Sequence, residues 1–276
     1  MIPSILRTAV IQAKADLRPN IIGIGIVNFL VTPILFFGIV AFLEDQMTGS
    51  REILFPATVA GIIGSYGVFM TTQIATEVFQ ERLNGTLLRV KTLPNGVPMW
   101  MIGRTLATGM FLFLQSAIFG TLSALVFLQE PGKIGLVIGL GLLGVIAHVP
   151  LAFLLVTLAR GSWTTFVVYL LSIGLFFLSG AAFPLSILPG WVEPIAKLLP
   201  GYWTSYLSQR ALLPDSAQEA FGLVPGQEWI AALAIMAWLV IGSFVAAKAT
   251  AASFQKETIG SLLSSNVKLR QQMGMS

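Results

Sequence analysis

Residues 134–158 read IGLVIGLGLLGVIAHVPLAFLLVTL, and no charged side chain interrupts them. About 20 consecutive apolar residues suffice for an α-helix to cross the roughly 30 Å hydrocarbon core of a bilayer. The hydrophobic residues are continuous and do not alternate with polar ones, which favours a helix over a strand of a closed barrel. This stretch therefore predicts a membrane-spanning helix.

The whole chain shares this character. It is 55% hydrophobic and only 10% charged, whereas about 25% of the residues of a soluble domain are charged. So few charges cannot cover a soluble surface, and we expect the outside to face lipid. The expected fold is an all-α polytopic membrane protein, with six transmembrane helices in a domain of residues 20–255 and a cytoplasmic tail at residues 256–276. The spans are predicted at about residues 20–43, 54–75, 100–127, 134–158, 163–183 and 229–252.

The distribution of Lys and Arg predicts the orientation. With these spans, 12 of the 16 basic residues fall on the side that carries both termini, and basic residues favour the cytoplasmic side. We therefore expect a multi-pass protein of the cell membrane with both termini in the cytoplasm. We attribute the positive net charge to this cytoplasmic bias of Lys and Arg, and we therefore expect no nucleic-acid partner. The cytoplasmic set is Arg7, Lys14, Arg18, Arg82, Arg89, Lys91, Arg160, Lys256, Lys268 and Arg270, together with Arg104 and Lys248, which are expected to snorkel outward from span ends.

The first 19 residues predict an amphipathic helix on the inner membrane surface. Apolar side chains from Ile2 to Leu17 share one helical face, while Arg7, Lys14 and Arg18 lie elsewhere on the wheel. The alternative is a basic flank with no structure of its own.

Thr76–Met99 is the longest predicted cytoplasmic loop and reads TEVFQERLNGTLLRVKTLPNGVPM. Asn84 and Gly85 form a helix stop, and Pro94 and Gly96 break the chain again before the third span. A helix, a break and a second helix that carry charges beneath the bilayer predict a docking element. A solvated loop with ordinary caps is the alternative.

The outer segment Pro184–Glu228 contains apolar stretches too short to span, separated by prolines and followed by aromatic residues. Such stretches favour a re-entrant or interfacial helical hairpin between spans five and six. An outer cap packed on the span ends fits the sequence as well.

Two polar or small-residue faces inside the spans are candidates for a translocation route. Hydroxyl and aromatic residues of span five recur at spacings of 4, 3, 4 and 3, and span two has a face of small residues. We expect the two faces to meet across a dimer; ordinary helix contacts are the alternative. His148, near the middle of span four, either binds the carbonyl freed by Pro150 or has a functional role. The candidate route residues are Gly61, Ser65, Thr72, Thr165, Tyr169, Ser172, Phe176 and Ser179.

Catalytic and metal-binding patterns are missing from the sequence. It has no Cys and one His, which excludes thiol nucleophiles and a two-His zinc site. A phosphate-binding loop needs G-x-x-x-x-G-K-[ST]. At Gly132-Lys133 the first glycine is replaced by Phe127 and the final hydroxyl residue by Ile134. We expect a protein that is not an enzyme and that holds no metal or cofactor.

Both long loops resemble those of the type-2 permease family of ABC transporters. The cytoplasmic loop resembles the family pattern through Glu81, Arg82, Gly85, Thr86, Leu87 and Pro94. The outer segment resembles it through Ser179-Gly180, Phe183-Pro184, Leu188-Pro189-Gly190-Trp191, Pro200, Tyr202 and Arg210. Gly201-Tyr202-Trp203 departs from the family, which more often has a longer Asn-Pro-Leu-x-Tyr stretch.

The resemblance implies a permease subunit of an exporter that pairs with a second permease, a copy or a paralogue. It implies a separate pair of ABC ATP-binding subunits, which would hold ATP and Mg. Drugs or antibiotics are the first expectation for the cargo, with polysaccharides or lipid-linked molecules as the alternative. A secondary transporter is disfavoured because no Asp or Glu lies in mid-span. The residues that the resemblance assigns to ATPase coupling are Glu77, Glu81, Arg82, Gly85, Thr86 and Leu87.

Overall fold

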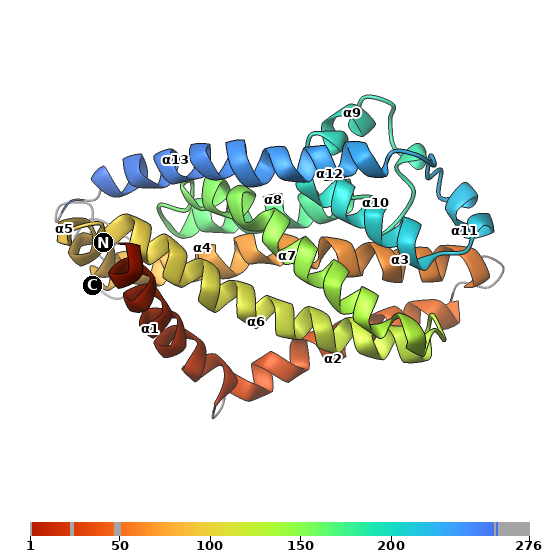
Figure 1. The fold of residues 1–276 in the computed structure, drawn as a ribbon, viewed down its shortest axis with the longest axis horizontal. Helices are drawn as coiled ribbons and strands as arrows, with labels where there is room; N and C mark the ends of the chain where they lie inside the picture. Colours follow the sequence, from red (N-terminus) through yellow and green to blue (C-terminus); the bar gives the residue numbers. More distant parts are fainter. Residues whose placement is uncertain (1, 23–24, 47–50, 257, 259–276) are drawn as a thin grey trace.

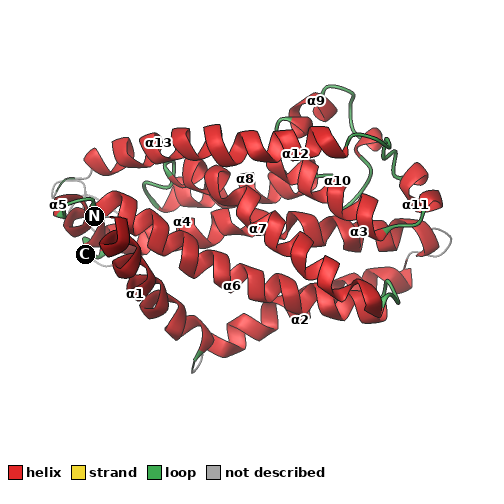
Figure 2. Cartoon of the chain, in the orientation of Figure 1, coloured by secondary structure: helices red, strands yellow, loops and turns green. Residues whose placement is uncertain are grey.

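The computed structural model describes residues 2–22, 25–46, 51–256 and 258, and every regular element in them is a helix (Figures 1 and 2). The helices form an elongated bundle, most of them along its long axis, with the start of α1 and the end of α13 at the same end (Figure 1). The expected all-α fold is confirmed. The predicted tail at residues 256–276 lies outside the described residues apart from Lys256 and Thr258.

The α-helices and their bounds are as follows in chain order. They are α1 (Ile2–Ile21), α2 (Gly25–Gln46), α3 (Arg51–Ser65), α4 (Met70–Leu83), α5 (Thr86–Thr92), α6 (Gly96–Val126), α7 (Ile134–Val156), α8 (Ser162–Leu178), α9 (Val192–Lys197), α10 (Pro200–Leu212), α11 (Asp215–Ala220), α12 (Glu228–Ala237) and α13 (Ser243–Gln255). Short 3₁₀ turns occur at η1 (Tyr66–Phe69), η2 (Pro131–Lys133) and η3 (Leu185–Ile187), and η4 (Trp238–Gly242) is a π-helical turn.

Several of these elements join into longer helical paths. η1 connects α3 to α4, and η4 connects α12 to α13 without a loop. Within the described residues, three helices are long and apolar enough to cross a membrane: Gly96–Val126, Pro131–Val156 and Glu228–Gln255. α8 is apolar but shorter. The count of six spans stays a prediction.

Two helix ends differ from the predicted span ends. α6 begins at Gly96 instead of Trp100, and the residue before it, Asn95, takes a left-handed conformation with φ of 54° that separates α6 from α5. α8 ends at Leu178 instead of Phe183. Gly180, two positions after the last residue of α8, has a left-handed conformation with φ of 68°. A left-handed glycine at this position commonly ends a helix.

α10 packs along α3 and α7 inside the bundle. Three of its side chains donate hydrogen bonds to carbonyls of α3: Ser205 to Gly61 at 3.1 Å, Ser208 to Ala60 at 2.5 Å and Gln209 to Ala57 at 3.1 Å. The predicted short helices of the outer segment are thus present. Whether they re-enter the bilayer or cap it stays a prediction.

Glycines bring the central helices unusually close together. A Cβ on Gly64 would lie 2.2 Å from the Thr204 carbonyl oxygen of α10. A Cβ on Gly144 of α7 would lie 2.2 Å from the Gly64 carbonyl oxygen, and one on Gly67 would lie 2.2 Å from the Gly144 carbonyl oxygen. Small residues allow such approaches between membrane helices. These three glycines therefore define the point where α3–η1, α7 and α10 meet.

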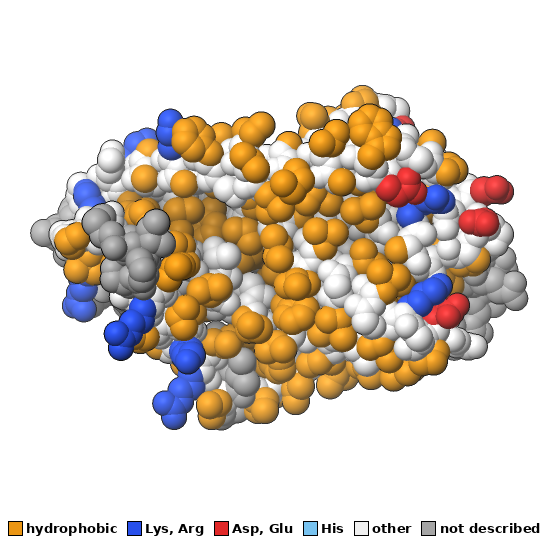
Figure 3. Space-filling view, viewed as in Figure 1, with side chains coloured by type: hydrophobic (Ala, Val, Ile, Leu, Met, Phe, Trp, Pro, Cys, Tyr) orange, Lys and Arg blue, Asp and Glu red, His pale blue; other side chains and the backbone are white. Residues whose placement is uncertain are grey.

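α1 is a helix, as predicted for the first residues, and it packs against α6 through Ala9 and Ala13, which are buried. Arg7, Lys14 and Arg18 are exposed. Figure 3 shows Lys and Arg side chains without visible Asp or Glu at the end that holds the start of α1, Asp and Glu side chains together with some Lys and Arg at the opposite end, and hydrophobic side chains between them. This charge distribution agrees with the one that the sequence analysis used for orientation.

Candidate functional site

The predicted docking segment is a bent pair of helices at the basic end of the bundle. α4 ends at Leu83, and Gly85 has φ of 72° just before α5 begins at Thr86. Glycine adopts this left-handed conformation without steric cost, which explains the position of the break. Leu87 then buries its side chain and anchors α5. The expected helix, break and second helix are confirmed.

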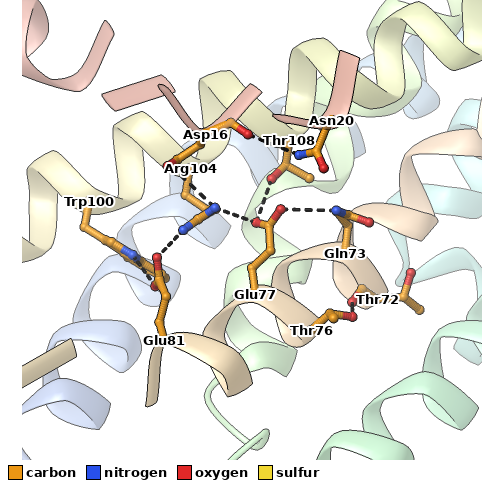
Figure 4. A network of polar contacts seen from close by, with 10 residues as sticks. All are labelled: Asp16, Asn20, Thr72, Gln73, Thr76, Glu77, Glu81, Trp100, Arg104 and Thr108. Atoms are coloured by element: carbon orange, nitrogen blue, oxygen red, sulfur yellow. Dashed lines mark hydrogen bonds and ion pairs between the residues drawn. The ribbon is translucent and has the colours of Figure 1, made fainter. Parts of the chain in front are cut away.

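Arg104 of α6 is the centre of a polar network that joins α1, α4 and α6 (Figure 4). Its Nη1 lies 2.8 Å from Glu77 Oε2 and 3.5 Å from Asp16 Oδ2, and its Nη2 pairs with Glu81. The guanidinium has the fixed fork of donors that suits several carboxylates at once. One side chain therefore connects three helices.

The carboxylates of Glu77 and Glu81 also accept hydrogen bonds from neutral donors. Glu77 accepts hydrogen bonds from Gln73 at 3.1 Å and from Thr108 at 3.4 Å (Figure 4). Glu81 accepts one from the indole Nε1 of Trp100 at 2.8 Å. These bonds stabilise the carboxylates away from bulk water and fix their rotamers.

The network holds three carboxylates for one guanidinium. The Arg104 side chain is 6% exposed, and the Glu77 and Glu81 side chains are 20% and 17% exposed. Burial raises the pKa of the Glu81 carboxyl, and the nearby charge of Arg104 opposes that rise. The stability of the network therefore depends on the positive charge of Arg104.

Arg104 corrects one expectation from the sequence. It was expected to snorkel to the cytoplasmic surface, but it is buried and turned toward the acids of α4. A signal was present, because Gln73, Glu77 and Glu81 recur every four residues on α4. Trp100, Arg104 and Thr108 do the same on α6. Residues four apart share a helix face, and a charge inside a membrane protein seeks a partner.

Arg82 also turns inward. Its side chain is buried, and Nη1 donates a hydrogen bond to the carbonyl of Ala159, which follows α7. All three charged residues predicted for ATPase coupling, Glu77, Glu81 and Arg82, thus engage other parts of their own chain. Their role in coupling stays a prediction.

The polar stripe of α8 faces the rest of the bundle. Thr165, Ser172 and Ser179 are buried. Tyr169 forms a hydrogen bond of 2.5 Å with Thr76 of α4, and the Phe176 ring lies 5.7 Å from that of Phe69. The stripe therefore packs on η1 and α4 within one chain.

The small-residue face of span two is also covered within the chain. A Cβ on Gly61 would lie 2.6 Å from Ala181 Cα, and Ser65 is buried with its hydroxyl near the Ile62 carbonyl. Thr72 donates to the Phe69 carbonyl at 2.8 Å. These residues have contacts inside the same molecule, and the expectation that the faces of spans two and five meet across a dimer stays a prediction. The geometry matches the alternative of helix contacts.

His148 is buried between η1 and α10. Its Nδ1 lies 2.7 Å from the Gly144 carbonyl oxygen, one turn earlier in α7. The carbonyl that Pro150 leaves without a backbone donor belongs to Ile146, so the expected partner was wrong, although the bond to a backbone carbonyl was right. This contact to a backbone carbonyl fits the structural alternative for His148.

Arg210 organises the outer end. Its Nε lies 2.9 Å from Glu228 Oε1 of α12, and its Nη1 donates to Gln218 of α11. Gln218 in turn donates to the Leu213 carbonyl at 2.7 Å. Across the described residues, no group of three or more His, Asp or Glu side chains is placed to hold a metal ion.

Comparison with known proteins agrees with this architecture. The sequence model of one protein family, described as ABC-2 family transporter protein, matches residues 38–248. These residues run from the second half of α2 to the middle of α13. No curated protein and no solved structure matches the chain. The match covers most of the sequence, including the α4–α5 bend and the outer segment. The chain therefore belongs to the ABC-2 transporter permease family and is a membrane component of an ABC transporter.

Proposed function

We propose that the chain is the permease subunit of an exporter in the cell membrane, driven by a pair of separate ATP-binding subunits. It would cross the bilayer six times, through α2, α3–η1 with the first residues of α4, α6, α7, α8 and α12–η4–α13, and the rest of α4 would lie on the cytoplasmic side. Both termini would lie in the cytoplasm, at the end where Lys and Arg gather (Figure 3).

One observation carries this proposal: α4 runs on from the membrane helix α3 through η1 and ends in the α4–α5 bend. A force applied at the bend would therefore act directly on a membrane helix. The Arg104 network ties α4 to α1 and α6, and the bond between Thr76 and Tyr169 ties it to α8. Movement of the bend would reach all four helices together.

The ATP-binding subunit would contact the outward side of this bend. Asn84, Arg89 and Leu93 are exposed there, and the Leu93 side chain is 54% exposed. Glu77, Glu81 and Arg82 face the opposite way, so they would hold the bend in place for the partner. Gly85 would allow the sharp turn, and Thr86 and Leu87 would start and anchor α5.

The cargo would be a hydrophobic or amphipathic compound such as a drug or an antibiotic. Its route would run beside the polar stripe of α8. Export of a polysaccharide or a lipid-linked molecule is the second candidate. A second permease, a copy or a paralogue, would pack on the exposed apolar side of α8, where Trp163, Leu170 and Ile173 are 71%, 51% and 50% exposed.

A single introduced thiol tests the docking surface, because the chain has no Cys of its own. Asn84→Cys, carrying a photoactivatable maleimide in native membranes, is expected to crosslink to a chain that contains G-x-x-x-x-G-K-[ST]. The physical reason is that Asn84 lies on the exposed side of the bend. Mass spectrometry of the crosslinked product provides the measurement.

Gly132→Cys is the matched control, because Gly132 is exposed and lies at the other end of α6 and α7. It is expected to give no such crosslink, and a membrane-impermeant maleimide is expected to label it only from outside the cell. Crosslinking of the ATP-binding chain from Gly132→Cys, or labelling of Asn84→Cys from outside, would sink the proposal.

A further inference from the structure

A cavity of about 130 Å³ lies where the outer segment folds against α10. Its walls come from five parts of the chain: the residues just after α8, the start of η3, α9, α10 and the turn after α11. The residues on which the argument rests are Ser179, Glu193, Tyr202, Tyr206, Gln209 and Phe221. Because roughly 10–15 Å³ of such space accommodates one water molecule, the cavity has room for a group of about ten heavy atoms.

Three polar side chains of the cavity walls, Gln209, Ser179 and Tyr206, donate their hydrogen bonds to backbone carbonyls. Gln209 Nε2 donates to the carbonyls of Ala57 at 3.1 Å and Gly180 at 3.2 Å. The hydroxyl of Ser179 donates to the Phe176 carbonyl at 2.6 Å, and that of Tyr206 donates to the Val224 carbonyl at 2.7 Å. The hydrogen-bonding capacity that these groups retain is therefore that of acceptors.

Part of the cavity wall is buried, whereas Tyr202 is half-buried and Glu193 is exposed. Ser179, Tyr206 and Gln209 are each 2% exposed, and Phe221 is 6% exposed. The ring faces of Tyr202, Tyr206 and Phe221 carry negative electrostatic potential, which attracts cations. Among the described residues that line the cavity there is no Lys or Arg. Aromatic faces, acceptors and one carboxylate form an environment suited to positive charge.

Glu193 supplies the carboxylate. Glu193 and Tyr202 both line the cavity. Burial, with the negative charge of Glu193 as a second cause, raises the pKa of Tyr202 to about 12. Glu193 also pairs with Lys197 at 2.7 Å, with both side chains more than a third exposed. Such exposed pairs contribute little to stability, so a ligand cation can take the place of Lys197.

We propose that this cavity binds an alkylammonium group, with Glu193 as its counter-ion and the rings of Tyr202 and Tyr206 around it. That the group is the cationic end of an amine cargo rests on the proposed export function. The binding itself does not depend on an ATP-binding subunit.

The test uses the purified full-length chain in lipid nanodiscs, without nucleotide or any partner. The probe is choline, compared with its uncharged isostere in which carbon replaces the quaternary nitrogen. Affinity is measured by saturation-transfer NMR titration. Choline is expected to bind about tenfold more tightly than the isostere, because only the cation gains from the carboxylate and the ring faces.

Three variants test whether the charge of Glu193 is responsible for choline binding. Glu193→Gln is expected to weaken choline binding about tenfold, and Lys197→Gln is expected to strengthen it about threefold, because the competing cation is removed. Glu219→Gln is the matched control: Glu219 is exposed in the same outer segment but does not line the cavity, so choline affinity is expected to be unchanged.

Equal affinity for choline and the isostere would overturn the proposal. So would an unchanged affinity in Glu193→Gln, or an absence of saturable choline binding. None of these results would affect crosslinking between Asn84→Cys and an ATP-binding chain, so a failure of this site and a failure of the proposed function can be told apart.

Discussion

Arg104→Met is expected to lower the free energy of unfolding by about 3 kcal/mol, because it leaves three part-buried carboxylates without their shared cation. Removing one partner of a buried ion pair costs more than removing both, since the remaining charge stays desolvated. Thermal unfolding in nanodiscs provides the measurement, and a fall of roughly 5–10 °C in Tm is expected.

Two comparisons identify the cause of this loss. Arg160→Met, at an exposed arginine on the same end, is expected to change stability by less than about 0.5 kcal/mol. Adding Glu77→Gln and Glu81→Gln to Arg104→Met is expected to restore at least half of the lost Tm, because the uncompensated charges are removed. If the triple variant were no more stable than Arg104→Met, a packing defect would explain the loss and the electrostatic account would be wrong.

The effect of Arg104→Met is also expected to depend on pH. Burial raises the pKa of Glu81 in the folded protein, so its contribution to stability falls as pH rises through the unfolded and then the raised folded pKa. Arg104 opposes that rise. Without it, the stability difference between variant and native protein is expected to be larger at about pH 8 than at about pH 5. The reverse order would contradict the assignment.

Gly144→Ala is expected to destabilise the bundle by about 2 kcal/mol or more. The added methyl would lie 2.2 Å from the backbone carbonyl oxygen of Gly64, and backbone cannot swing aside as a side chain can. α7 would have to separate from α3, which would also disturb the contact of Gly64 with α10. The Tm in nanodiscs is expected to fall by roughly 4–8 °C.

Gly139→Ala on the same helix is the matched control. No atom lies within 4 Å of a Cβ built at Gly139, and alanine favours a helix over glycine by about 1 kcal/mol. This variant is therefore expected to be as stable as the native protein or slightly more so. Equal Tm values for Gly144→Ala and Gly139→Ala would show that the close approach of α7 to α3 does not stabilise the bundle.

The elements themselves could be predicted from local patterns. Continuous apolar stretches predicted helices at α6, α7 and α12–α13, and Asn84-Gly85 predicted the break between α4 and α5. These features depend on neighbours in the sequence, since apolar length, helix stops and left-handed glycines act within one or two turns. Span ends were less accurate: the glycine that stops α8 was read as part of a continuing span.

Side-chain direction was harder to predict. The sequence showed that Glu77, Glu81 and Arg82 are charged and lie together, and it suggested a surface that faces a partner. The structure turns Glu77 and Glu81 toward Arg104, and it turns Arg82 toward the carbonyl of Ala159. Matching four-residue spacings on α4 and α6 could have indicated the network, but the pairing of two helices is a tertiary property.

The sequence by itself determined a charge-poor helical chain, the break at Gly85 and the separation of basic from acidic ends, because composition and local backbone preference fix these features. Only the tertiary structure decided which helix faces meet. It placed Arg104 among three acids, buried Gly61 and Ser65 inside one molecule, and formed the outer cavity from five separate segments. The physical reason is that packing and charge pairing depend on the distance between helices, which no local pattern contains.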